Sequence, residues 1–133
     1  MERIKKIIIA ICFIVVSCNF AYSQDITSLV TPQNIDFNIC TKRYNMSEDK
    51  LFYMAIASAN ANNFTVNEIQ SKTGYILFTA ASKQYLASIV KINSKTSMLK
   101  ITPVNNRYYF APGIVLNFFK YIDINLNAQI LKS

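Results

Sequence analysis

Four short segments between Phe64 and Val104 alternate apolar with polar residues, and polar turns separate them. A period of two is typical of β-strands, whose successive side chains point to opposite faces of a sheet. The turns, near Gly74, at Ser82 and Lys83, and over residues 93–96, are short. Turns of this length join only antiparallel neighbours, because a parallel pair needs a crossover of a dozen or more residues. The pattern therefore predicts a four-stranded antiparallel meander.

The alternation divides this predicted sheet into two faces. We expect the helices to pack on a face made of Ile76, Phe78, Ala80, Leu86, Val90, Ile92, Leu99 and Ile101. The second face then carries Tyr75, Leu77, Thr79, Tyr85, Ala87, Ile89, Lys91, Met98, Lys100 and Thr102. A fully solvated face should alternate more cleanly to polar residues. We expect either residues 24–40 or a partner protein to cover it. The candidate interaction face comprises Tyr75, Leu77, Tyr85, Ile89, Lys91, Lys100 and Arg107.

Two helices are predicted to flank the meander. Ser47 is a suitable N-cap for the first, and small residues such as Ala55 and Ala59 would let that helix lie close to a sheet. The second follows Pro112, and its apolar positions recur at helical spacing: Val115, Phe118, Phe119, Ile122 and Leu126. Upstream, Ile35, Phe37 and Ile39 alternate as a short strand would. Ile69 is out of phase with Val66, which predicts a β-bulge near Glu68. The predicted fold class is α+β, a two-layer sandwich of helix, antiparallel four-strand meander and C-terminal helix.

The first 23 residues have the pattern of an export signal. Arg3, Lys5 and Lys6 precede an apolar core over residues 7–16, and small residues follow. This core is well below the roughly 20 residues that span a bilayer. Two processing sites compete. Cleavage between Ser23 and Gln24 would release a soluble chain, and we favour it. Alternatively, residues 15–18 resemble a bacterial lipobox, in which Cys18 would be lipidated and would tether the chain to a membrane.

The chain after Ser23 is long enough for one small domain with one core. We divide the sequence into a signal peptide at residues 1–23, an N-terminal extension with a short strand at 24–46, and an α+β domain at 47–131. Removal of the signal takes three of the 14 basic and one of the seven acidic residues, which leaves a formal charge of +5. A basic exported protein is expected to meet anionic lipids, acidic glycans or acidic proteins, and not nucleic acid.

The residue types present argue against catalysis. The chain has no histidine, which excludes Ser-His, Cys-His and histidine-metal sites. Its acidic residues are scattered, and no metal-ligand spacing or phosphate-binding glycine loop is found. We expect no catalytic residue, no cofactor and no metal. Cys40 is the one cysteine outside the signal region, and we expect a buried structural thiol there, although Lys42 and Arg43 are near enough in sequence to lower its pKa.

An alanine-rich helix, then "FTV", then a "GYILF" strand after a turn resembles small two-layer domains of outer-membrane assembly lipoproteins of the BamC kind. The resemblance implies helices on one side of an antiparallel sheet and an adaptor role without catalysis. No functional residue is carried over from it.

Two functions fit these observations. The first is a non-catalytic structural or adaptor protein of the bacterial cell envelope, in the periplasm or secreted, or alternatively an outer-membrane or cell-surface lipoprotein anchored through Cys18. Its partner would be another envelope protein, bound at the sheet face or at a sheet edge. The alternative is a small periplasmic module that binds an amphiphile or lipid between the sheet and the helix around Phe118 and Phe119.

Overall fold

The computed structural model describes the backbone of residues 28–132 and the side chains of residues 28–126. The expected signal peptide, its cleavage between Ser23 and Gln24, and the lipidation of Cys18 lie outside the described residues. The elements in chain order are β1 (Gln33–Asn34), a 3-10 helix η1 (Phe37–Cys40), β2 (Thr41–Tyr44), α2 (Glu48–Ala61), β3 (Thr65–Gln70), β4 (Tyr75–Ala80), β5 (Lys83–Asn93), β6 (Thr96–Pro103), β7 (Tyr109–Phe110) and α3 (Gly113–Lys132).

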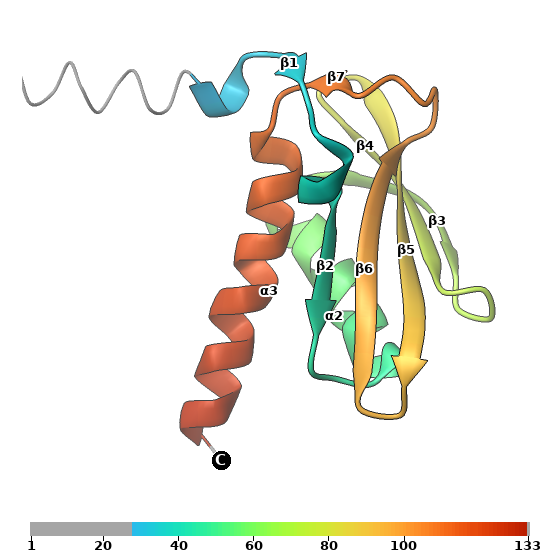
Figure 1. Ribbon diagram of the computed structural model, residues 1–133, viewed down its shortest axis with the longest axis vertical. Coiled ribbons are helices and arrows are strands. Elements are labelled where there is room, and N and C mark those ends of the chain that lie inside the picture. The colour runs from blue at the N-terminus through green and yellow to red at the C-terminus, as the bar shows by residue number, and fades with distance from the viewer. Residues whose placement is uncertain (1–27, 133) are drawn as a thin grey trace, which may run out of the picture.

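The main sheet has five strands in the order β2-β6-β5-β4-β3, and every neighbouring pair is antiparallel. The meander β3 to β6 confirms the sequence prediction. It returns to β2, which pairs with β6 and forms the opposite edge from β3. Since β2 and β3 are four antiparallel pairs apart, they run in the same direction, and α2 connects them by crossing one face of the sheet (Figure 1). The fold is therefore α+β, with β2 as a strand of the sheet.

Helix α2 begins and ends as its sequence predicts. The Ser47 hydroxyl accepts a hydrogen bond from the Lys50 amide, and Glu48 and Asp49 occupy the first turn, where the helix dipole favours negative charge. Asn63 follows the helix with a φ of 59°, a left-handed conformation that asparagine tolerates. Local hydrogen bonding therefore determines where α2 starts and stops.

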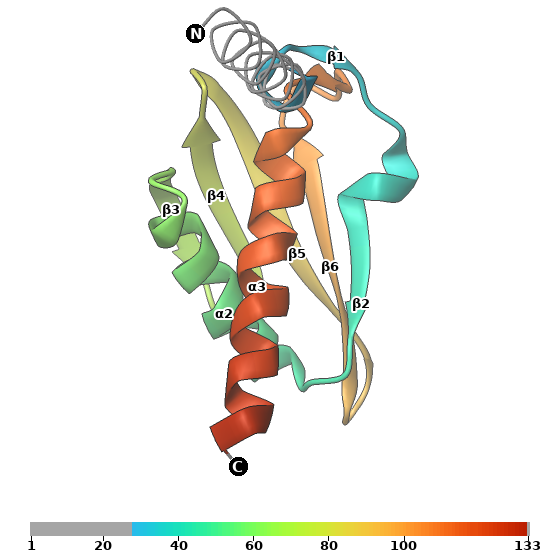
Figure 2. The same ribbon diagram turned by 90° about the vertical axis from the view of Figure 1, so that its left-hand side faces the viewer.

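Both helices lie on the same face of the sheet, side by side (Figure 2). The buried positions of α2 include Ala55 and Ala59, which let the second helix approach closely. Ser58 is fully buried between the helices, and its hydroxyl donates a hydrogen bond to the Phe118 carbonyl at 2.7 Å. On α3, the predicted apolar face is buried at Val115, Phe118, Phe119 and Ile122. The two-layer arrangement is confirmed.

Stacked aromatic rings fill the space between the helices and the sheet. The Phe78 ring of β4 lies 5.4 Å from Phe64, 5.5 Å from Tyr85 and 5.4 Å from Phe118, measured between ring centroids. The Tyr85 ring in turn meets Phe110 edge to face at 5.3 Å. Aromatic pairs at such distances contribute about 0.5–1.5 kcal/mol each beyond the burial of their area. The ring stack joins the residue before β3 with β4, β5, β7 and α3 in one core.

Two sequence predictions were wrong in this part of the chain. Ile35 to Ile39 was expected to be a strand, but Phe37–Cys40 forms η1, because the Asp36 carboxylate caps a tight turn by accepting a hydrogen bond from the Asn38 amide at 2.9 Å. Leu86 and Val90 were expected on the helix side, but Tyr85 and Ile89 face the helices instead, with exposed fractions of 0% and 7%. The first error misplaces a short segment, whereas the second inverts both faces of β5.

Hairpin geometry explains the inversion in β5. The β4–β5 turn is formed by Ala81 and Ser82, both at positive φ, so Ala80 pairs with Lys83 and Phe78 with Tyr85. Across this two-residue loop, every pair joins an even-numbered residue of one strand to an odd-numbered residue of the other. The side chains of directly paired residues point to the same face of the sheet. The face of Phe78 therefore continues through Tyr85. Because β5 is apolar on both faces, its hydrophobic pattern alone did not determine the phase.

The predicted bulge is present. The β3–β4 register shifts between Val66 and Glu68, so one extra residue, Asn67, enters the edge strand. The bulge returns Ile69 to the side of Val66, since Ile69 pairs with the buried Ile76. This confirms the explanation of why Ile69 is out of phase.

Candidate functional site: the open face of the sheet

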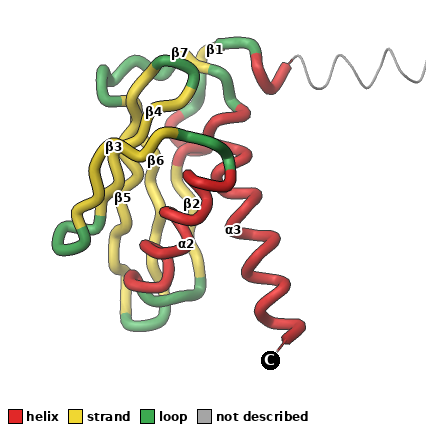
Figure 3. Tube along the Cα trace, turned by 180° about the vertical axis from the view of Figure 1, so that it is seen from behind, coloured by secondary structure: helices red, strands yellow, loops and turns green. Residues whose placement is uncertain are grey.

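The second face of the sheet, which we call the open face, is turned away from both helices (Figures 1 and 3). Strand register determines which side chains it carries. They include Thr41 and Arg43 from β2, Met98, Lys100 and Thr102 from β6, Gln84, Leu86, Ser88 and Val90 from β5, Tyr75, Leu77 and Thr79 from β4, and Thr65, Glu68 and Gln70 from β3.

Apolar cross-strand pairs occupy the centre of the open face. Leu77 lies opposite Leu86, and Val90 lies opposite Met98. Val90 is 44% exposed and the other three side chains are half-buried. Such pairs stabilise a sheet by about 0.2–1 kcal/mol each. Their partial exposure leaves apolar surface in contact with solvent, which a partner protein can bury.

Polar and charged groups border this apolar centre. On the β3 side, the Glu68 carboxylate accepts hydrogen bonds from Gln70 at 2.8 Å and from the Tyr75 hydroxyl at 3.3 Å. Desolvation, together with the Glu68 charge, raises the pKa of Tyr75 above its usual value, so the phenol remains a donor. On the opposite side stand two cations, Arg43 and Lys100. The border is thus acidic along β3 and basic along β2 and β6.

A shallow groove of about 430 Å³ runs across one end of the open face. Its floor includes Leu77, Leu86 and Thr102, and residues Val104 and Asn106 of the β6–β7 loop form one wall. Val104 is 52% exposed. The groove therefore adds concave apolar surface to the open face.

Only some of the seven residues predicted to form the interaction face lie on the open face. Tyr75, Leu77 and Lys100 lie on the open face, as expected. The assignment of Tyr85 and Ile89 was wrong, because the register of the two-residue β4–β5 hairpin turns both side chains toward the helices, where they are buried.

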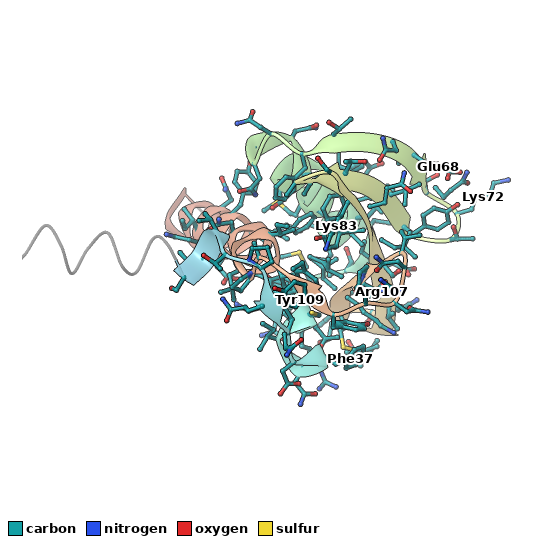
Figure 4. The ribbon with its side chains drawn as sticks, turned by 90° about the horizontal axis from the view of Figure 1, so that it is seen from above. Phe37, Glu68, Lys72, Lys83, Arg107 and Tyr109 are labelled. Atoms are coloured by element: carbon teal, nitrogen blue, oxygen red, sulfur yellow. The ribbon has the colours of Figure 1, made fainter. Side chains whose placement is uncertain are left out.

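The two remaining predicted residues do not occupy strand positions of the open face. The placement of Lys91 on this face was wrong, because Lys91 pairs with the buried Ser97 and is therefore exposed on the helix side of β5. Arg107 is exposed in the β6–β7 loop, and Figure 4 shows it on the same side of the molecule as Glu68 and Lys72. Sequence reasoning missed Leu86, Val90 and Arg43, and counting residues across the two-residue hairpin would have identified the first two.

The N-terminal extension borders the open face without covering it, as far as its described part goes. Residues 33–34 pair with β7, and residues 41–44 extend the sheet edge as β2. Phe37 lies beside Lys100, whose ammonium is 5.2 Å from the ring centroid, and meets Tyr108 edge to face. We expected either residues 24–40 or a partner protein to cover the open face. The described part of the N-terminal extension instead extends the edge of the sheet.

Cys40 has the environment of a structural thiol. It is fully buried, and its Sγ lies 3.8 Å from the Asp36 carbonyl oxygen. Burial, followed by the Asp36 charge, raises the pKa of the thiol to about 11. Since the thiolate is the nucleophilic form, Lys42 and Arg43 do not activate it. Lys42 instead pairs with Asp123 at 2.5 Å.

The described acidic residues have structural contacts of their own. Asp36 caps η1, Glu48 and Asp49 begin α2, and Glu68 is bonded to Tyr75. Over residues 28–132 no three His, Cys, Asp or Glu side chains come together as metal ligands would. Within the same range, none of the helices combines the length and apolar character needed to cross a bilayer.

No protein-family model matches the chain, and no curated protein matches it in sequence. The function of this protein must therefore be inferred from the geometry of its sheet, its helices and its hollows.

Proposed function

We propose that this protein is an exported, non-catalytic interaction module of the bacterial cell envelope, and that its open face binds another envelope protein. The observation that carries the proposal is the apolar centre formed by Leu77, Leu86, Val90 and Met98, accessible on a face turned away from both helices. Apolar patches bordered by polar groups mark interaction sites in soluble proteins. The basic residues Arg43 and Lys100 favour a partner surface with acidic groups beside its apolar contact.

The carrier alternative has less support at the position expected for it. Phe118 and Phe119 were expected to line a ligand space between helix and sheet. Phe118 is fully buried and packs against Phe78 and Phe64, with ring centroids 5.4 and 6.5 Å away. Aromatic side chains occupy that volume, so the open face is the better candidate for binding.

Site-specific photo-crosslinking in the intact host tests the proposal. A photoreactive residue at Val90 should give one discrete adduct with an envelope protein, because Val90 is 44% exposed at the centre of the face. The matched control is Tyr53, which is 69% exposed on α2. Leu86→Asp, made in addition, should abolish the Val90 adduct while the chain remains folded. Equal adducts from Val90 and Tyr53, or an adduct unaffected by Leu86→Asp, would refute the open face as the binding surface.

Intact mass of the protein recovered from its host tests export separately. A mass beginning at Gln24 supports a soluble exported chain, and a mass beginning at Cys18 with added acyl groups supports a tethered lipoprotein. An unprocessed chain starting at Met1 would refute export. This outcome is independent of whether the open face binds a partner.

A further inference from the structure

Two adjoining hollows lie at the end of the domain where α2 ends and α3 begins. The larger, about 230 Å³, is mainly apolar, with walls that include Leu29, Phe64 and Ile114. The smaller, about 80 Å³, is lined by Tyr85, Lys83 and Phe110 among others. The two hollows have four lining residues in common: Val30, Ala81, Ala111 and Ile114. They are therefore parts of one space that is partly open to solvent.

The N-terminal segment forms the outer wall of this space. Leu29 and Val30 line it although they are 37% and 65% exposed. The segment approaches the start of α3 so closely that a Cβ atom on Gly113 would lie 2.8 Å from the Leu29 carbonyl oxygen. Glycine at this position lets the wall lie against the helix. The hollow is therefore built from four separate parts of the chain, within residues 29–32, 62–64, 81–85 and 110–117.

A buried hydroxyl lacks a hydrogen-bond partner at this site. Tyr85 is fully buried, and its hydroxyl bonds to no described group. Leaving a buried polar group unsatisfied costs about 1–3 kcal/mol. Desolvation raises the pKa of this phenol, so it stays protonated and able to donate. An acceptor entering the smaller hollow would satisfy the hydroxyl.

A cation stands beside this phenol. Lys83 and Tyr85 are two residues apart on β5, so both point to the same face, roughly 7 Å apart along the strand. Lys83 donates one hydrogen bond to the Tyr109 carbonyl at 3.1 Å and lies 5.9 Å from the Tyr109 ring, and both side chains are labelled in Figure 4. An ammonium has three N–H donors, so the Lys83 ammonium has further donors to offer a ligand. Of the described residues lining the two hollows, Lys83 alone is charged.

We propose that this space binds a single-chain amphiphile with a carboxylate head, of the size of a medium-chain fatty acid. The head would lie in the smaller hollow, where it accepts hydrogen bonds from the Tyr85 phenol and the Lys83 ammonium. The alkyl chain would fill the larger hollow against Leu29, Phe64 and Ile114. A charge-assisted pair at the head and apolar walls around the tail match this chemistry. The site is separate from the open face and does not depend on the function proposed for that face.

The test is a titration of the purified protein with decanoate labelled with ¹³C at its carboxyl carbon, followed by NMR. The expected result is saturable binding of one molecule per chain. Tyr85→Phe and Lys83→Gln should each weaken binding about 10- to 100-fold, the effect of losing one hydrogen bond to a charged group. Decanol, which lacks the charge, should bind more weakly than decanoate and should lose less affinity than decanoate does with Lys83→Gln. Ala111→Leu, whose larger side chain would fill part of both hollows, should abolish binding.

Matched substitutions elsewhere serve as controls. Tyr75→Phe and Lys100→Gln change the same groups on the open face and should leave the affinity for decanoate unchanged. Tyr85→Phe removes a single atom that has no partner among the described residues, so this variant should remain folded even if Ala111→Leu does not. Absence of saturable binding by the unaltered protein would overturn the proposal. So would an affinity that Tyr85→Phe and Lys83→Gln leave unchanged.

Discussion

Two neighbouring residues of β5, Ile89 and Val90, provide the sharpest test of how this sheet is oriented. Ile89 points toward the helices and is 7% exposed, whereas Val90 lies on the open face and is 44% exposed. The same substitution, to aspartate, should therefore have very different consequences at the two positions. Sequence patterning alone predicts the reverse order, since it places Ile89 on the second face and Val90 beneath the helices.

The expected loss at Ile89 follows from burial. Ile89→Asp forfeits about 2–3 kcal/mol of apolar transfer free energy. It adds a cost of about 1–3 kcal/mol for a buried polar group without a partner. The new carboxyl group would also face Glu48 and Asp49 across the hollow that Ile89 helps to line. A total near 3–6 kcal/mol is a large part of the roughly 5–15 kcal/mol that stabilises a small domain. Val90→Asp should cost no more than about 1 kcal/mol.

Urea unfolding followed by far-UV circular dichroism measures both values. Ile89→Asp should move the midpoint to much lower urea, or leave the chain unfolded without denaturant, and Val90→Asp should unfold close to the unaltered protein with the same slope. Comparable losses in the two variants, or a larger loss at Val90, would mean that the β4–β5 register of Phe78 with Tyr85 is wrong. The open face would then lose two of its central residues.

Two further predictions concern Cys40 and Gly74. Folding raises the pKa of the Cys40 thiol from 9.0 to about 11, so the folded state favours the protonated thiol. The contribution of this thiol to stability is therefore full below pH 9 and is lost as the pH rises from 9 toward 11. Urea unfolding of the unaltered protein and of Cys40→Ala at pH 8 and pH 10.5 should show this extra loss only when the thiol is present, and an equal pH dependence in both would contradict it. Gly74 has a φ of +71°, and a Cβ there would lie 3.3 Å from the Ile89 carbonyl oxygen, so Gly74→Ala should lower the free energy of unfolding by about 1–2 kcal/mol. Ala81 has a φ of 48°, so Ala81→Gly should raise the free energy of unfolding. A gain in stability from Gly74→Ala would refute the expected backbone strain at Gly74.

Much of the fold follows from short-range rules. The Ser47 cap and the stop at Asn63 depend on hydrogen bonds and backbone conformations within a few residues, and both agree with the structure. The buried face of α3 likewise follows from apolar residues spaced by three or four. The bulge at Asn67 is readable because a bulge interrupts an otherwise regular alternation. In each case the relevant partners are near one another in sequence.

The candidate site was less predictable, because it depends on contacts between segments. Tyr75, Leu77 and Lys100 were placed correctly because their strands have one clearly more apolar side. On β5 both sides are apolar, and the pairing of Phe78 with Tyr85 decides which side is buried. The hollow beside Tyr85 was not foreseen, since residues 29–32 reach it only after β1 pairs with β7.

By itself, the sequence determined that this chain forms helices and an antiparallel meander, because periodicity, caps and turns act over a few residues. It also excluded sites that depend on histidine, since the sequence contains none. Only the tertiary structure decided that Leu86 and Val90 face outward, that β2 joins the edge of the sheet, and that Tyr85 meets Lys83 at a hollow. Those outcomes depend on strand register and on contacts between distant segments, which bury one apolar side chain in preference to another of nearly equal hydrophobicity.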